Sequence, residues 1–128
     1  MVSNFLRASR EEIKLQLNSV LLTNRQDIKV YEFIPERPSL PCFVISPGAP
    51  YISQGTAFCD FQTRFEVLVL ADKLTNEAAT TLLDQLIVEA VDALETWFIE
   101  EVEQPSAYEI NGGTFLGTKL NITADKTL

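Results

Sequence analysis

The chain has 128 residues, of which 46% are hydrophobic and 22% charged, and this is the composition and length of one compact domain that folds without a metal or a disulfide. The net charge of −8 and the absence of histidine exclude a basic groove for nucleic acid, a His-dependent catalytic triad and a His-based zinc site. We therefore predict a single domain over residues 1–128 that is not an enzyme and needs no cofactor.

No stretch approaches the roughly 18 consecutive apolar residues of a membrane span, and the first residues lack the apolar run of a secretory signal. We expect a protein of the cytoplasm without membrane contact. The acidity is uneven, because residues 1–40 carry a charge of +1 and residues 41–128 a charge of −9. Cys42 and Cys59 do not form a C-x-x-C pair, and we interpret both as reduced core or strand residues.

The first predicted element is a helix. Its apolar residues recur at helical spacing, at Phe5, Leu6, Ile13, Leu17, Val20 and Leu21. Ser9 and Glu12 offer a capping box within the segment, so the helix begins either near Asn4 or near Ser9. It is expected to end near Asn24.

Three strands are predicted next. The run IKVYEF (28–33) has the composition of a strand, CFVIS (42–46) that of a short buried strand, and PGAP (47–50) is expected to turn the chain. From Ala57 to Leu70 apolar and polar residues alternate, which predicts a half-buried antiparallel strand. Such a strand would span roughly 48 Å, more than the domain can cover, so we expect a bulge, a bend or a protruding arm.

A long helix and a hairpin complete the chain. Asn76 is predicted to cap a helix that continues to about Phe98, with an apolar arc on one half. Its other half carries Asp84, Asp92 and Glu95. Residues 107–110 and 114–124 are predicted to pair as a hairpin through Asn111-Gly112-Gly113. The order α-β-β-β-α-β-β predicts an α+β fold with a mixed, mainly antiparallel sheet and one long amphipathic helix packed on it.

Five of the six prolines fall within residues 34–53, IPERPSLPCFVISPGAPYIS. Pro35, Pro38 and Pro41 restrict the backbone to extended conformations and predict a stiff loop. Such a loop loses little entropy on meeting a partner, and Glu36 and Arg37 on it are suited to pairing across a subunit boundary. A surface crossover that only covers the sheet is an equal alternative.

The stretch ERPSLPCFVISPGAPYIS (36–53), the alternating strand after it and the helix sequence TNEAATTLLDQLIVEAVDAL (75–94) resemble the tail terminator, or minor tail, proteins of long-tailed bacteriophages with flexible tails. The resemblance covers residues 28–124 and includes the order of the elements. It implies a virion protein that forms a hexameric ring on the last ring of the tail tube, stops its polymerisation and presents a surface to the head connector protein.

This resemblance places the protein at the head-tail junction of the virion, and in the host cytoplasm during assembly. The expected partners are further copies of the chain, the tail tube protein and the connector protein, without specific nucleic-acid binding. The acidity would keep a ring lumen from holding DNA phosphates. The candidate interface residues are Pro35, Glu36, Arg37, Pro38, Pro47, Tyr51 and Phe58.

Two alternatives stay open. One is a head-tail connector or another neck protein of similar size. The other is a small α+β ligand-binding or enzymatic domain with a pocket between sheet and helix. The missing histidine and the lack of polar clusters inside the apolar runs oppose the second alternative.

Overall fold

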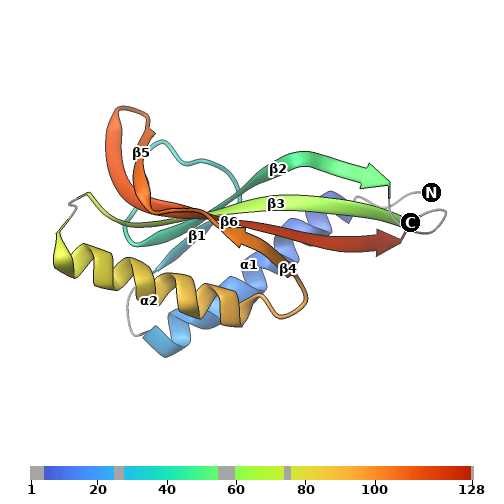
Figure 1. Cartoon of the computed structure of the whole chain (residues 1–128), viewed down its shortest axis with the longest axis horizontal. Coiled ribbons are helices and arrows are strands. Elements are labelled where there is room, and N and C mark those ends of the chain that lie inside the picture. Colours follow the sequence, from blue (N-terminus) through green and yellow to red (C-terminus); the bar gives the residue numbers. More distant parts are fainter. Residues whose placement is uncertain (1–4, 25–27, 55–59, 74–75, 128) are drawn as a thin grey trace.

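A computed structural model describes residues 5–24, 28–54, 60–73 and 76–127. The fold is α+β, with two helices and one mixed sheet of six strands (Figure 1). In chain order the elements are α1 (Phe5–Asn24), β1 (Lys29–Tyr31), β2 (Cys42–Gln54), β3 (Asp60–Asp72), α2 (Glu77–Ala93), β4 (Phe98–Val102), β5 (Ser106–Ile110) and β6 (Gly113–Thr127).

The strand order in the sheet is β1-β2-β3-β6-β4, and β5 pairs separately with β6. β1 and β2 are parallel, and the other pairings are antiparallel. The predicted fold class is therefore confirmed, but the predicted element order is wrong at the end of the chain. A strand, β4, lies between α2 and the closing hairpin.

The end of the second helix accounts for this difference. Asn76 caps α2 as predicted, with its side-chain oxygen accepting a hydrogen bond from the Ala79 amide at 2.8 Å. The helix ends at Ala93 rather than near Phe98, and Leu94 has a non-helical backbone. Thr96 is held instead by hydrogen bonds of 2.6 Å to Glu12 and Gln16 of α1. The chain then continues into β4.

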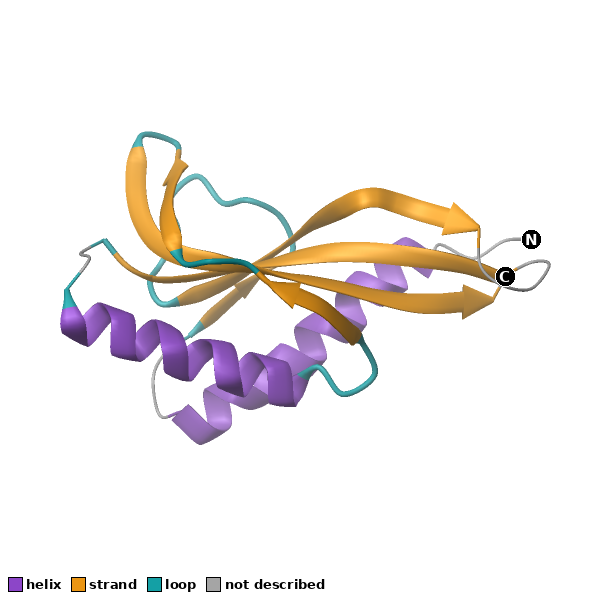
Figure 2. Ribbon diagram, in the orientation of Figure 1, coloured by secondary structure: helices purple, strands orange, loops and turns teal. Residues whose placement is uncertain are grey.

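Both helices cover the sheet, and they lie on the same side of it (Figure 2). This corrects the expectation of one packed helix. α1 begins at Phe5, which agrees with the earlier of its two predicted starts, and Ser9 is buried inside it. Near the start of α1 the rings of Phe5 and Phe61 stack with centroids 6.4 Å apart, so the helix also covers the beginning of β3.

The prediction that residues 47–50 turn the chain is wrong, because β2 runs through them to Gln54. β1 pairs only with Cys42–Val44, so the rest of β2 has no strand of the described chain on its outer side. Proline is tolerated on such an edge, where its missing donor breaks no ladder. A register shift against β3 between Pro47 and Ile52 absorbs extra residues of β2.

The expected irregularity of the long strand is present as a bulge. β3 pairs with β6 along its whole length and has a register shift between Leu70 and Asp72. Gly117 of β6 lies at this point, where an added Cβ would stand 2.4 Å from the Val69 carbonyl oxygen. Only glycine allows the two strands to approach this closely. Ala57–Cys59, the start of the predicted strand, lie outside the described residues.

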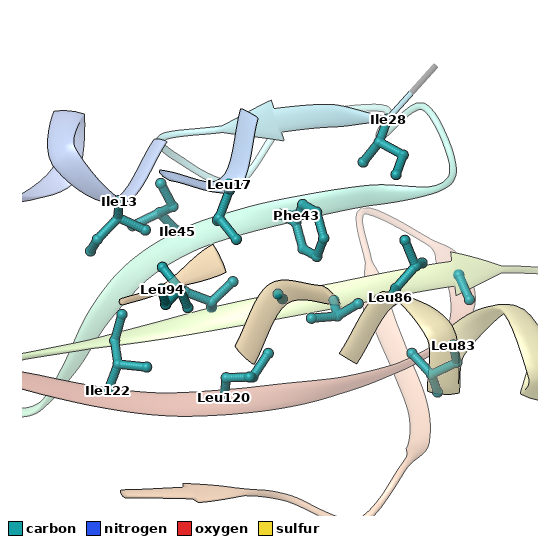
Figure 3. Close-up of a cluster of buried hydrophobic side chains, with 14 of the residues drawn as sticks. Ile13, Leu17, Ile28, Phe43, Ile45, Leu83, Leu86, Leu94, Leu120 and Ile122 are labelled. Carbon is teal, nitrogen blue, oxygen red and sulfur yellow. The ribbon is translucent and has the colours of Figure 1, made fainter. Parts of the chain in front are cut away.

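The main core lies between the sheet and the helices, as Figure 3 shows. Its fully buried side chains come from both helices and from β2, β3 and β6, and they include Ile13, Leu17, Phe43, Ile45, Phe65, Leu83, Leu86, Leu120 and Ile122. Because successive residues of a strand point to opposite faces, Cys42 and Val44 of β2 enter a second cluster on the other face.

The closing hairpin and the proline segment cover this second cluster. Ile110 and Phe115 of the hairpin and Leu40 of the proline segment pack into it. The hairpin turn is confirmed: Ile110 pairs with Gly113, and the two turn residues Asn111 and Gly112 have φ angles of 48° and 85°. Positive φ at both positions is the geometry of a two-residue turn that matches the twist of the strands.

Candidate functional site

The proline segment (residues 32–41) connects β1 to the parallel strand β2. It begins beside α1, where Glu32 lies 4.0 Å from Lys14, and its later part reaches the face opposite the helices, where Leu40 packs into the second cluster. Side-chain hydrogen bonds hold its middle and its later part. The amide of Ser39 donates to the Tyr31 hydroxyl at 3.1 Å, and the Asn111 side chain donates to the carbonyls of Pro35 and Glu36 at 3.2 Å. The segment is therefore a crossover that covers the sheet, as one of the two interpretations expected, and its position is fixed by side-chain hydrogen bonds.

The candidate residues within this segment divide into two pairs. The side chains of Pro35 and Pro38 are half-buried, whereas Glu36 and Arg37 are exposed. The prolines hold the backbone and the charged side chains point to solvent, so this arrangement offers a preformed ionic contact at little entropic cost.

The other candidates lie elsewhere. Pro47 is exposed on the edge of β2. The half-buried Tyr51 packs edge to face on Phe65, with centroids 5.4 Å apart, and its hydroxyl accepts a hydrogen bond of 2.8 Å from Arg10. These contacts account for Tyr51 within the monomer. Phe58 lies outside the described residues.

A hollow of about 400 Å³ opens where β1 ends and β2 loses its neighbour. It is lined by Arg10, Glu32, Phe33, Ile34, Ile45, Ser46 and Pro47. The side chains of Phe33 and Ile34 are 73% and 58% exposed, so this is the largest apolar surface that the segment offers to a partner. Of the candidate interface residues that the structure describes, Pro47 alone lines it.

A polar network occupies the sheet face opposite the helices, beyond the second cluster. The Arg64 guanidinium bonds Glu100 of β4 at 2.8 Å, Gln62 at 2.8 Å and Ser53 of β2 at 3.3 Å. It thereby links strands that are not neighbours in the sheet. All of its partners are within the chain, and the side chains are typical of a solvated sheet face.

The described residues also bear on metal binding, thiol reactivity and membrane insertion. They contain no group of three side chains that could hold a metal ion. Burial raises the pKa of the Cys42 thiol to about 12, so this cysteine is a core residue, as predicted, and an unreactive one at neutral pH. Cys59 lies outside the described residues. Neither described helix is long and apolar enough to cross a membrane.

The sequence does not predict the exposure of Phe33, Ile34 and Phe98. Phe33 falls in a predicted strand, Ile34 in the predicted stiff loop and Phe98 at the predicted end of the second helix. The signal for Phe33 and Ile34 is their place directly before Pro35, because a proline lacks the backbone donor that a strand needs to continue its ladder. Phe98 has no comparable signal.

The sequence matches no protein-family model and no curated protein.

Proposed function

We propose that the protein is a tail terminator of a long-tailed bacteriophage, which forms a ring on the end of the tail tube, stops its growth and provides the surface that joins the head. The observation that carries the proposal is the proline segment, with Glu36 and Arg37 exposed on a crossover whose prolines are half-buried and whose backbone is tied at Ser39, Pro35 and Glu36. The same stretch carries the resemblance to the terminator family.

The rest of the described molecule is consistent with a protein that acts by binding a partner of complementary shape. The described residues contain no metal-binding cluster, and the polar network around Arg64 is satisfied within the sheet. A protein of this kind acts stoichiometrically, by an interface that fits the growing end of a polymer. A subunit that copies only one side of the repeating contact ends an otherwise open assembly.

The test is a phage that lacks this protein. We expect heads and tail tubes that do not join, with tubes of abnormal length in electron micrographs of lysates. Addition of the purified protein to such tubes should cap them. Normal tube length together with normal joining would overturn the proposal, whereas normal length with failed joining would favour a head-tail connector instead.

A substitution of Arg37 tests the role of the proline segment. Arg37→Glu should leave the melting temperature unchanged, because the side chain is exposed, and should reduce the yield of joined particles about tenfold or more. Lys29→Glu, at an exposed position on β1, is the matched control and should assemble normally. If Arg37→Glu lowered the melting temperature, or if it assembled like the control, the proline segment would serve only to cover the sheet and would not be an interface.

A further inference from the structure

The sheet has two edges on opposite sides of the molecule. β1 ends at Tyr31, which pairs with Val44, so β2 from Ile45 onwards has no outer neighbour in the part of the chain that the structure describes. At the other edge β4 pairs with β6, and no further described strand lies beside it. As far as the structure describes the chain, both edges are open.

Each edge exposes large apolar side chains. At the β2 edge Phe33 and Ile34 stand beside the hollow of about 400 Å³. At the β4 edge Phe98 is 68% exposed and Val102 is 39% exposed. The hollow falls within the roughly 300–1,000 Å³ range of pockets for small ligands, so it has room for an aromatic side chain.

Backbone pairing between two such edges is opposed on both sides. Pro47 has no backbone donor, and β2 has a register shift between Pro47 and Ile52. β4 has a shift between Ile99 and Glu101. Bulges and prolines are devices that keep sheet edges from joining as one ladder. A contact between the edges therefore has to be made by side chains.

The charges of the two edges also differ. Residues 95–103 carry Glu95, Glu100, Glu101 and Glu103 and no basic residue. Arg64 neutralises Glu100 at 2.8 Å, whereas Glu101 and Glu103 bond the neutral side chain of Asn121, so the edge keeps a negative charge. Two β4 edges would repel each other.

The lining of the hollow holds one base and one acid, Arg10 and Glu32. Glu32 lies 4.0 Å from Lys14 of α1 and so already has a cationic partner, and the Tyr51 hydroxyl accepts one of the N–H groups of Arg10. A guanidinium has five donors in a fork that suits carboxylates, so the hollow fits an acidic strand.

We propose that the hollow bounded by Arg10, Phe33, Ile34 and Pro47 receives Phe98 of a second copy of this chain, with the acidic β4 edge facing Arg10. The inference rests on the proposed function in taking the partner to be a neighbour in a ring. It adds the two surfaces that meet. They differ from each other, so the contact is head to tail, and an open chain of copies keeps one free surface of each kind, at its two ends, until the ring closes.

Thiol cross-linking tests this pairing. Phe33→Cys and Phe98→Cys are made singly in a Cys59→Ser background, and the two proteins are mixed at high concentration with a short bismaleimide. The buried thiol of Cys42, with a pKa of about 12, does not compete. We expect the mixture to give cross-linked dimers, because the proposed contact brings position 33 of one copy to position 98 of the next. Each single variant alone should give none, since only an isologous contact would bring two identical positions together.

The matched control is a pair of cysteines on the helices. Leu15 and Val88 are 72% and 68% exposed, close to the 73% and 68% of Phe33 and Phe98, and they lie on α1 and α2. The mixture of Leu15→Cys and Val88→Cys should cross-link at least about tenfold less than the Phe33 and Phe98 mixture, a ratio that corresponds to about 1.4 kcal/mol of preference. The same comparison is made with purified tail tubes added, which would align copies on a template.

The outcomes separate the inference from the proposed function. Cross-linking at the level of the helix control in both conditions would overturn the inference, even if the protein caps tubes. Linkage of Phe33→Cys to itself would replace it with an isologous dimer, and linkage to the tube protein alone would assign the hollow to the tube. Linkage of the predicted pair in a protein that neither caps tubes nor joins heads would sustain the contact and remove the terminator function.

Discussion

Phe65→Ala should lower the free energy of unfolding by about 3–5 kcal/mol, the range for truncation of a fully buried phenylalanine. The ring of Phe65 meets Tyr51 and Trp97 edge to face, at centroid distances of 5.4 and 5.7 Å, and Arg10 lies over it at 5.8 Å. The substitution therefore removes contacts that join α1, the edge of β2 and the segment between α2 and β4. A loss of this size is a large part of the roughly 5–15 kcal/mol that stabilises a domain.

Urea unfolding followed by fluorescence measures this loss, because Trp97 is the one tryptophan of the chain and contacts the substituted ring. Circular dichroism at the same urea concentrations checks that the two signals change together. Phe33→Ala is the control, since a side chain that is 73% exposed should change stability by no more than about 0.5 kcal/mol. Similar losses for the two variants would mean that Phe65 is not central to the core.

The parts of the fold that the sequence predicts correctly are those determined by interactions between residues close together in the chain. Asn76 caps α2 because its own side chain reaches the amide three residues on. Asn111 and Gly112 form the hairpin turn because these residue types adopt positive φ readily. The buried face of α2 follows from spacing alone, and Leu83, Leu86 and Ala90 all point into the core.

The predictions are wrong where contacts with residues distant in the sequence determine the local structure. Pro47 and Pro50 are strong signals for a turn, yet β2 passes through both. The sequence near these prolines does not contain the reason, which is that β1 stops at Tyr31 and leaves the strand on an edge. The end of α2 has a similar origin. The apolar spacing continues to Trp97, which stays buried although the helix has ended, so the pattern alone extends the helix too far.

The candidate site shows the same division. The exposure of Glu36 and Arg37 follows from their place between prolines, and the structure agrees. The hollow does not follow from any local pattern, because Arg10 comes from α1, Phe33 from the segment after β1 and Pro47 from β2. Tyr51 illustrates the converse, since a residue chosen as a surface contact has its ring against Phe65 and its hydroxyl bonded to Arg10.

Leu86→Ala should lower the free energy of unfolding by about 2–5 kcal/mol. Leu86 lies near the middle of α2 with no exposed surface, and its side chain points toward the sheet in the main core (Figure 3). Alanine is a strong helix former, so the helix itself is not weakened by the change. The loss therefore comes from buried apolar surface and from the cavity that the shorter side chain leaves.

Two controls on the same helix separate packing from helix stability. Val88 is 68% exposed, and Asp84 is exposed on the polar half. Val88→Ala and Asp84→Ala change helix propensity in the favourable direction and remove little buried surface, so both should stay within about 0.5 kcal/mol of the unsubstituted protein in urea unfolding. If Asp84→Ala were as destabilising as Leu86→Ala, the assignment of the buried and solvated faces of α2 would be wrong. If Val88→Ala alone were that destabilising, the outer face of α2 would be covered by another part of the molecule or by a second copy, and its exposed valine would belong to an interface.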